Sequence, residues 1–211
     1  SSKDRMTSML RVAVGGSTSI KAACADAAAN CFATAWLFCV LTSSCFSQVA
    51  PSAGEIAGYT GVLAAAARGD AAEIARLTAA GADVNAREAY GRTPLHVATF
   101  GRHRDAIAAL AKARADLNLK ERDSYDAVTI AAVANDPGTL RVLLQLGASA
   151  KQVTSRYDGT ALIAAAHLGH DEVVKLLLGA GAPLDHVNNL GWTALIESIV
   201  LGQGGPRHVE T

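Results

Sequence analysis

The sequence predicts an all-α solenoid of repeated helix–turn–helix units, and two periodic sequence motifs support that prediction. Residues 91–98 read Gly-Arg-Thr-Pro-Leu-His-Val-Ala. Weaker copies of this phrase are centred on Thr60, Asp126, Thr160 and Thr193. Counted through Thr93, successive copies lie 33, 33, 34 and 33 residues apart. A second motif, three residues long, recurs with the same period at 81–83, 114–116, 147–149 and 181–183. Periods of this length are typical of solenoids whose units stack on their neighbours.

Composition agrees with closely packed helices. Half of the residues are hydrophobic but only 5% are aromatic, so the apolar residues are mostly Ala, Leu and Val. Such residues suit helix-on-helix packing better than a sheet sandwich. The 19 basic and 19 acidic residues give a formal net charge of zero, and no basic stripe emerges. This balance argues against a nucleic-acid partner.

Residues 1–54 precede the repeats and are predicted to be a leader followed by a disordered linker. No charged residue lies between Asp26 and Glu55, and residues 31–41 form the most hydrophobic run of the chain. A basic flank, a short apolar run and then small residues resemble a secretory signal peptide. We therefore expect export, to the periplasm or out of the cell. Cleavage is expected after Ser47, Ala50 or Ala53.

Two kinds of membrane attachment remain open for this leader. An uncleaved segment at 27–49 could act as a membrane tether, although its strongly apolar part is shorter than the ~20 residues that a spanning helix needs. A lipid anchor at Cys45 is the second option, although Thr42 stands where a lipobox normally has Leu. All four cysteines lie within the first 45 residues and lack paired C-x-x-C spacing. They are expected to be apolar filler rather than zinc ligands.

From Glu55 onward each unit reads as a loop, a short helix, a tight turn, a second helix and a glycine-centred exit. In the clearest copy, 160–168 is the first helix and Gly169-His170 forms the turn. The second helix starts at Asp171-Glu172, where acidic side chains favour the helix dipole. Gly179-Ala180-Gly181 then ends it, because glycine tolerates the left-handed exit conformation.

These residues resemble the ankyrin repeat, whose consensus includes Gly-x-Thr-Pro-Leu-His-x-Ala-Ala, Gly-His and Gly-Ala-Asp-x-Asn. The chain looks like bacterial, exported proteins of this kind over residues 55–211. The resemblance implies four full units and a partial fifth. Their expected bounds are 58–88, 89–121, 122–154, 155–188 and 189–211. It also implies a non-catalytic module that binds another protein through its loop tips and the concave face of its first helices.

The units depart from the consensus at four places. Asp126 replaces the Thr of the third unit, and Asn135-Asp136-Pro137 replaces its Gly-His turn. Arg114 replaces an exit glycine, which predicts a side chain at positive φ and local strain. The fifth unit carries an insertion at 202–208 where its turn should be. Its second helix is missing, so we expect the array to continue beyond Thr211, because an open apolar end needs a cap.

The aromatic residues of the repeats fall on positions that the family leaves free for binding. Tyr and Trp offer large, stiff contact surfaces and are enriched in binding sites. The predicted partner-binding residues are Tyr90, Arg92, Phe100, Arg122, Tyr125, Arg156, Tyr157, His167 and Trp192. The alternative is that these rings only cover neighbouring loops.

No catalytic constellation, cofactor site or metal site is predicted. The sequence has no Gly-x-Ser-x-Gly, phosphate-loop or His-Glu-x-x-His motif. His96 and His170 fill structural slots of the family and are expected to bond loop backbone. The second interpretation of the whole chain is a regulatory or targeting segment of a larger enzyme whose chemistry lies beyond Thr211.

Overall fold

The structure, a computed structural model, describes residues 48–200 of the 211-residue chain. The predicted leader up to residue 47, which includes most of the tether predicted at 27–49, and the insertion at 202–208 lie outside these residues. Within them the fold is the predicted all-α solenoid of helix–turn–helix units, with four full units and the first helix of a fifth. Two antiparallel strands of two residues each are the only strands in this part of the chain.

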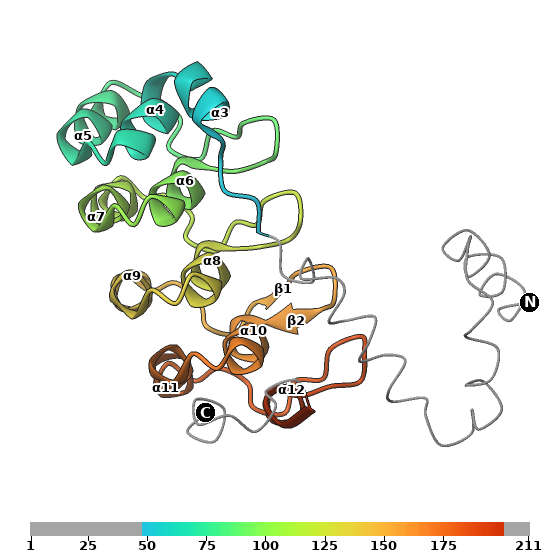
Figure 1. The fold of residues 1–211 in the computed structure, drawn as a ribbon. Helices are drawn as coiled ribbons and strands as arrows, with labels where there is room; N and C mark the ends of the chain where they lie inside the picture. Colours follow the sequence, from blue (N-terminus) through green and yellow to red (C-terminus); the bar gives the residue numbers. More distant parts are fainter. Residues whose placement is uncertain (1–47, 201–211) are drawn as a thin grey trace, which may run out of the picture. The chain divides into compact units, whose positions relative to one another are not determined.

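The helices form two rows (Figure 1). The first helices of the units are α4 (Gly61–Arg68), α6 (Pro94–Phe100), α8 (Ala127–Val133), α10 (Ala161–Leu168) and α12 (Ala194–Val200). The second helices are α5 (Ala71–Ala79), α7 (Arg104–Lys112), α9 (Pro137–Gln145) and α11 (Asp171–Gly179). Each helix contacts its counterpart in the next unit, so the units stack in chain order.

Each first helix begins at the periodic Thr or Asp. Thr160 accepts a hydrogen bond from the Ile163 amide, and Asp126 accepts one from the Thr129 amide in the same way. Pro94 occupies the first turn of α6, where its missing N–H is no loss. The replacement of Thr by Asp in the third unit therefore preserves the helix cap.

The turns between helices follow the glycine pattern and its exceptions. Gly69 and Gly169 are left-handed, with φ of 72° and 66°. In the second and third units the same place is held by Arg102 and Asn135, which are also left-handed. Arg114 has φ 64°, which confirms the positive φ predicted at that exit.

The core runs through all units as one apolar cluster, in which Leu95, Ile107, Leu140, Leu162 and Leu177 are all buried. Each such side chain contributes about 1.5–3 kcal/mol by leaving water. Stability therefore comes from stacking one unit against the next.

The two ends of the described fold differ. At the end of the array, α12 exposes Leu195 by 67%, whereas Leu162, in the same place one unit earlier, is 1% exposed. At the beginning, a short helix α3 (Ala53–Gly58) precedes the first unit and is capped by Ser52. Helical structure thus starts at Ala53, before Glu55. No helix within residues 48–200 has the length and apolarity to cross a membrane.

Candidate functional site: the stacked loop tips

Four loop tips, at 88–92, 121–125, 155–159 and 188–192, join the units. In three of them the first residue uses one side-chain oxygen to accept two main-chain amides. Glu88 Oε1 accepts from the amides of Tyr90 and Arg92 at 2.9 and 3.0 Å. Glu121 Oε1 and Asn188 Oδ1 accept the equivalent pairs, with all four distances at 3.0 Å. Ser155 makes one such bond, to the Tyr157 amide.

The fourth residue of every tip is left-handed. These residues are Gly91, Ser124, Asp158 and Gly191, with φ of 75°, 67°, 53° and 82°. The amide of each one donates back to the carbonyl of the first residue of its own tip. Because this conformation costs a side-chain-bearing residue about 1 kcal/mol, the tip must be held by its other hydrogen bonds.

Hydrogen bonds also join each tip to the next. The Arg122 amide donates to the Tyr90 carbonyl at 3.0 Å, and the Asn189 amide donates to the Tyr157 carbonyl at 3.0 Å. Between these pairs, the Ser155 amide donates to the Ser124 carbonyl at 3.1 Å. We call this set of tips the loop ladder. It fixes the spacing between side chains that come from different units.

Side chains reinforce the loop ladder at its base. The Arg87 side chain bonds the carbonyls of Gly91 and Lys120, both at 2.9 Å. Arg156 forms an ion pair with Asp123 of the preceding tip at 3.0 Å, and both side chains are largely exposed. Exposed pairs of this kind add little stability, so these charges remain available to a ligand.

The structure places the nine predicted residues in three classes. Tyr90, Arg122 and Arg156 are exposed, with Tyr90 at 46%. The half-buried residues are Phe100, Tyr157, His167 and Trp192. Arg92 and Tyr125 are 1% and 4% exposed. The expectation that Arg92 and Tyr125 face outward is therefore wrong, because both side chains are buried, Arg92 by its contacts with Glu88, Val49 and Glu55.

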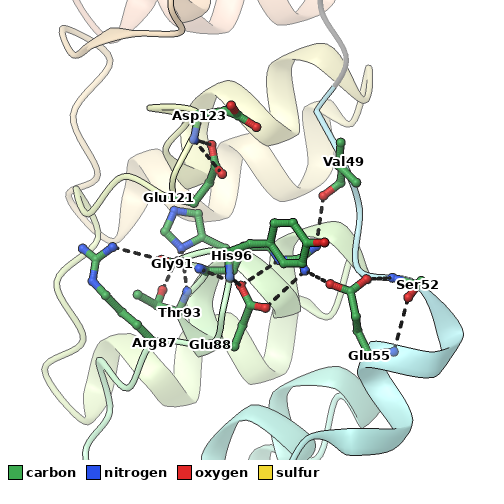
Figure 2. A network of polar contacts seen from close by, with 12 residues as sticks. Val49, Ser52, Glu55, Arg87, Glu88, Gly91, Thr93, His96, Glu121 and Asp123 are labelled. Atoms are coloured by element: carbon green, nitrogen blue, oxygen red, sulfur yellow. Dashed lines mark hydrogen bonds and ion pairs between the residues drawn. The ribbon is translucent and has the colours of Figure 1, made fainter.

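Arg92 is buried in a polar network at the start of the loop ladder (Figure 2). Its Nε donates to Glu88 Oε1 at 3.0 Å, and one Nη atom donates to the Val49 carbonyl at 3.1 Å. The other Nη atom forms an ion pair with Glu55 of α3. The guanidinium also lies 4.8 Å from the centre of the Tyr90 ring, a cation–π distance. Arg92 thus joins the N-terminal segment to the first tip.

The carboxylates of this network are held in their charged form. Burial alone would raise the pKa of Glu88, but hydrogen bonds and charge from Arg92 outweigh it and lower that pKa. Hydrogen bonds from Ser52 are the main cause of the lowered pKa of Glu55, to which Arg92 adds. The network is therefore ionised at neutral pH.

His96 has the structural role predicted for it. Its Nδ1 accepts from the Thr93 amide at 3.1 Å, so the ring proton is on Nε2, which donates to the Tyr125 carbonyl at 3.2 Å. Burial lowers the pKa of His96 to about 4. The ring is consequently neutral and joins one unit to the tip of the next.

Two histidines of the fourth unit, His167 and His170, contact different partners. His170 Nδ1 lies 2.9 Å from the Ala132 carbonyl, so its partner is main chain as predicted, but in the last turn of α8 rather than in a loop. His167 lies 3.0 Å from Glu197, which also accepts a hydrogen bond from Asn188. Across residues 48–200, no three His, Cys, Asp or Glu side chains are grouped so as to hold a metal ion.

The residues that sequence reasoning missed are the first residues of the tips. Glu88, Glu121, Ser155 and Asn188 are spaced 33, 34 and 33 residues apart, in the phase of the periodic Thr. All four can accept a hydrogen bond, which is the property their position requires. That shared chemistry, rather than shared identity, is the signal that could have revealed them.

Comparison with known proteins agrees with this architecture. The family described as "Ankyrin repeats (3 copies)" matches residues 26–121 and 128–205. The ankyrin repeat protein YahD of Escherichia coli is 32% identical over 144 residues, covering 68% of this chain and 71% of that protein. The glycerophosphocholine phosphodiesterase gde1 of Schizosaccharomyces pombe is 33% identical over 85 residues, which cover 40% of this chain and 8% of that protein. The ankyrin repeat and SOCS box protein 18 of Homo sapiens is 36% identical over 131 residues, 62% of this chain and 28% of that protein.

Proposed function

The chain belongs to the ankyrin repeat family, and from this we propose that its loop ladder binds another protein without catalysing a reaction. Ankyrin repeats are generally protein–protein interaction modules. The observation that carries the proposal is the set of hydrogen bonds between tips, which holds side chains of different units in fixed relation. A surface that is already ordered loses little conformational entropy when a partner binds.

The proposed contact residues are those that project from the loop ladder. Tyr90 supplies an exposed ring, and Arg122 and Arg156 supply exposed guanidinium groups that can bond main-chain carbonyls or carboxylates. The half-buried side chains extend this surface toward the first helices; they are Phe100, Tyr157, His167 and Trp192. Arg92 and Tyr125 are proposed to act indirectly, by holding the tips in place.

A matched pair of double variants tests the proposal. The first is Tyr90→Ala with Arg156→Ala on the loop ladder. The second is Leu178→Ala with Arg141→Ala on the second helices, where Leu178 is 38% exposed and Arg141 forms an exposed ion pair with Glu172. A partner captured from the source cells with the wild-type chain would be purified, and its affinity measured by calorimetry. We expect the first variant to weaken binding by more than about tenfold and the second to leave it unchanged. Equal effects, with both variants folded, would contradict the proposal.

We also propose that the protein is exported and that its partner is periplasmic or extracellular. The support is the order of basic flank, apolar run and small residues within 1–50. Intact-mass measurement of the protein from its source cells tests this. A mature N-terminus at Gln48, Pro51 or Gly54 is expected, whereas an unprocessed segment would favour the tether at 27–49. A lipid adduct on Cys45 would indicate the lipid anchor.

The second candidate function is a regulatory or targeting segment of a larger enzyme. The similarity to 8% of the phosphodiesterase gde1 favours it, since the segment similar to this chain is a small part of a protein named as an enzyme. The reading frame beyond Thr211 separates the two candidates. A frame that closes within one further unit supports the binding module, and a frame that runs on into a catalytic domain supports the enzyme segment.

A further inference from the structure

Helix α3 has the sequence of a loop tip. Glu55, Gly58 and Thr60 stand in the same relation as Glu88, Gly91 and Thr93, and the offset of 33 residues is that of the other units. Glu55 corresponds to the residue that accepts two main-chain amides in three of the four tips. Gly58 corresponds to the residue that is left-handed in all four tips.

In the structure these residues adopt a helical conformation instead of that of a tip. Residues 53–58 form a helix, and Gly58 is not among the left-handed glycines. Glu55 instead completes a capping box with Ser52 and pairs with Arg92. The Tyr59 amide, which a tip would direct to Glu55, donates to the Ile56 carbonyl at 3.1 Å.

Helix α3 is held weakly. It has six residues, none of which is buried. Two of them, Gly54 and Gly58, are less favourable in a helix than alanine. Helices of this length are not stable without tertiary packing. The helix therefore depends on the Ser52 cap and on Arg92.

The loop ladder has a place for another tip beside the first one. In the second and fourth tips the second residue donates its amide to the preceding tip, as Arg122 does to Tyr90 and Asn189 to Tyr157. Ala89 is the equivalent donor of the first tip, and among residues 48–200 no acceptor for its amide is found. The acceptor that the periodicity assigns to Ala89 is the carbonyl of Ala57.

We propose that residues 52–59 are a two-state element, which converts between helix α3 and an additional tip on the loop ladder. In the tip form Glu55 accepts the amides of Ala57 and Tyr59, Gly58 becomes left-handed, and the Ala89 amide bonds the Ala57 carbonyl. Arg92 keeps Glu88 but loses Glu55 and Val49. The two Nη atoms of Arg92 can then bind a carboxylate group of a partner beside Tyr90. This last consequence rests on the proposed function, whereas the conversion itself does not.

Nuclear magnetic resonance of the full chain tests the conversion without any partner. The Cα shifts of residues 55–57 report the helix, and the amide proton shift of Ala89 reports the new hydrogen bond. Ser52→Ala removes the helix cap and leaves the tip form unchanged. We expect it to raise the ratio of tip to helix by about fivefold, with both reporters moving together.

Two glycine variants provide matched controls. At both Gly54 and Gly58 the space that an added methyl group would occupy is open, so alanine fits at either place in the helical form. Each substitution favours the helix by propensity, but only Gly58→Ala also opposes the left-handed conformation of the tip. In the Ser52→Ala background, Gly58→Ala should lower the tip population by a clearly larger factor than Gly54→Ala. Loss of helix in Ser52→Ala without a shift at Ala89 would be simple fraying and would overturn the proposal, as would equal effects of the two glycine variants.

Discussion

His96 Nε2 lies 3.2 Å from the main-chain oxygen of Tyr125, so a side chain of the second unit holds the loop tip that opens the third. The same ring accepts from the Thr93 amide. The contact with Thr93 needs the neutral ring, because a protonated Nδ1 cannot accept a hydrogen bond, and burial of the ring favours that neutral state. This ring makes stacking between these units sensitive to pH.

The first prediction concerns that sensitivity. The pKa of His96 is about 4 in the fold, against about 6.5 in an unfolded chain. The unfolded state therefore binds more protons between these values, so stability is complete above pH 6.5 and falls as the pH drops. We expect a loss of about 3 kcal/mol between pH 7 and pH 4, measured by urea unfolding. His96→Asn should lower stability at pH 7 and flatten this slope; an unchanged slope would contradict the assignment.

The second prediction concerns Asp126, which is buried and has one carboxylate oxygen, Oδ2, without a hydrogen-bond partner in the described residues. Burial raises the pKa of Asp126 above its usual value. Its folded form therefore prefers the proton, and its contribution to stability is lost as the pH rises through the folded pKa. Asp126→Thr restores the residue found in the other units and keeps the helix cap. We expect about 1 kcal/mol of added stability at pH 7, shrinking as the pH falls toward 4.

The pH effects of His96 and Asp126 have opposite signs in an overlapping range. The His96 titration is therefore best measured in the Asp126→Thr background. A gain from Asp126→Thr that did not change with pH would show that the carboxyl group is not the cause.

The third prediction concerns Arg114, whose φ of 64° is left-handed. Other units have glycine at this exit, and Gly81, Gly147 and Gly181 are all left-handed there. Arg114→Gly should raise the free energy of unfolding by about 0.5–1 kcal/mol by relieving backbone strain. Lys112→Gly, two residues earlier in α7, is the control and should lower it by a similar amount. A loss of stability in Arg114→Gly would mean that the arginine side chain outweighs the strain.

The fourth prediction concerns the buried ion pairs of Arg92. Arg92→Met leaves Glu88 buried without its cation, while Glu55, whose side chain is 28% exposed, can regain water. We expect a loss of about 3 kcal/mol and faster amide exchange in residues 52–58. Arg141→Met, which breaks an exposed pair with Glu172, should change stability by less than about 1 kcal/mol. Comparable losses in the two variants would contradict the role of burial.

The sequence was sufficient to predict the fold, because the 33-residue period marks each stacked unit. It also placed the first helix of the fourth unit at 160–168 and predicted the positive φ at Arg114, since these depend on local chemistry. Helix α3 was not predicted. Residues 55–60 have the pattern of a loop tip, and the contact with Arg92 that stabilises the helix spans 37 residues.

The exposure of the predicted contact residues was predicted only in part. Tyr90, Arg122 and Arg156 were placed correctly at exposed positions of the tips, and Arg92 and Tyr125 were not. Periodicity gives the place of a residue within a tip but not the direction of its side chain. For Arg92 that direction depends on contacts with Glu88, Val49 and Glu55, the last two of which lie 43 and 37 residues earlier in the chain.

The hydrogen bonds within each tip have a consequence for how this surface could change over time. Glu88, Glu121 and Asn188 bond main-chain amides, which are the same whatever side chains those residues carry. Ala89, Tyr90, Arg122 and Asp123 can therefore be exchanged for other residues at little cost to folding. Mutation can alter which molecules such a protein recognises while the scaffold beneath stays constant, and a library randomised at these positions would yield folded variants with new specificities.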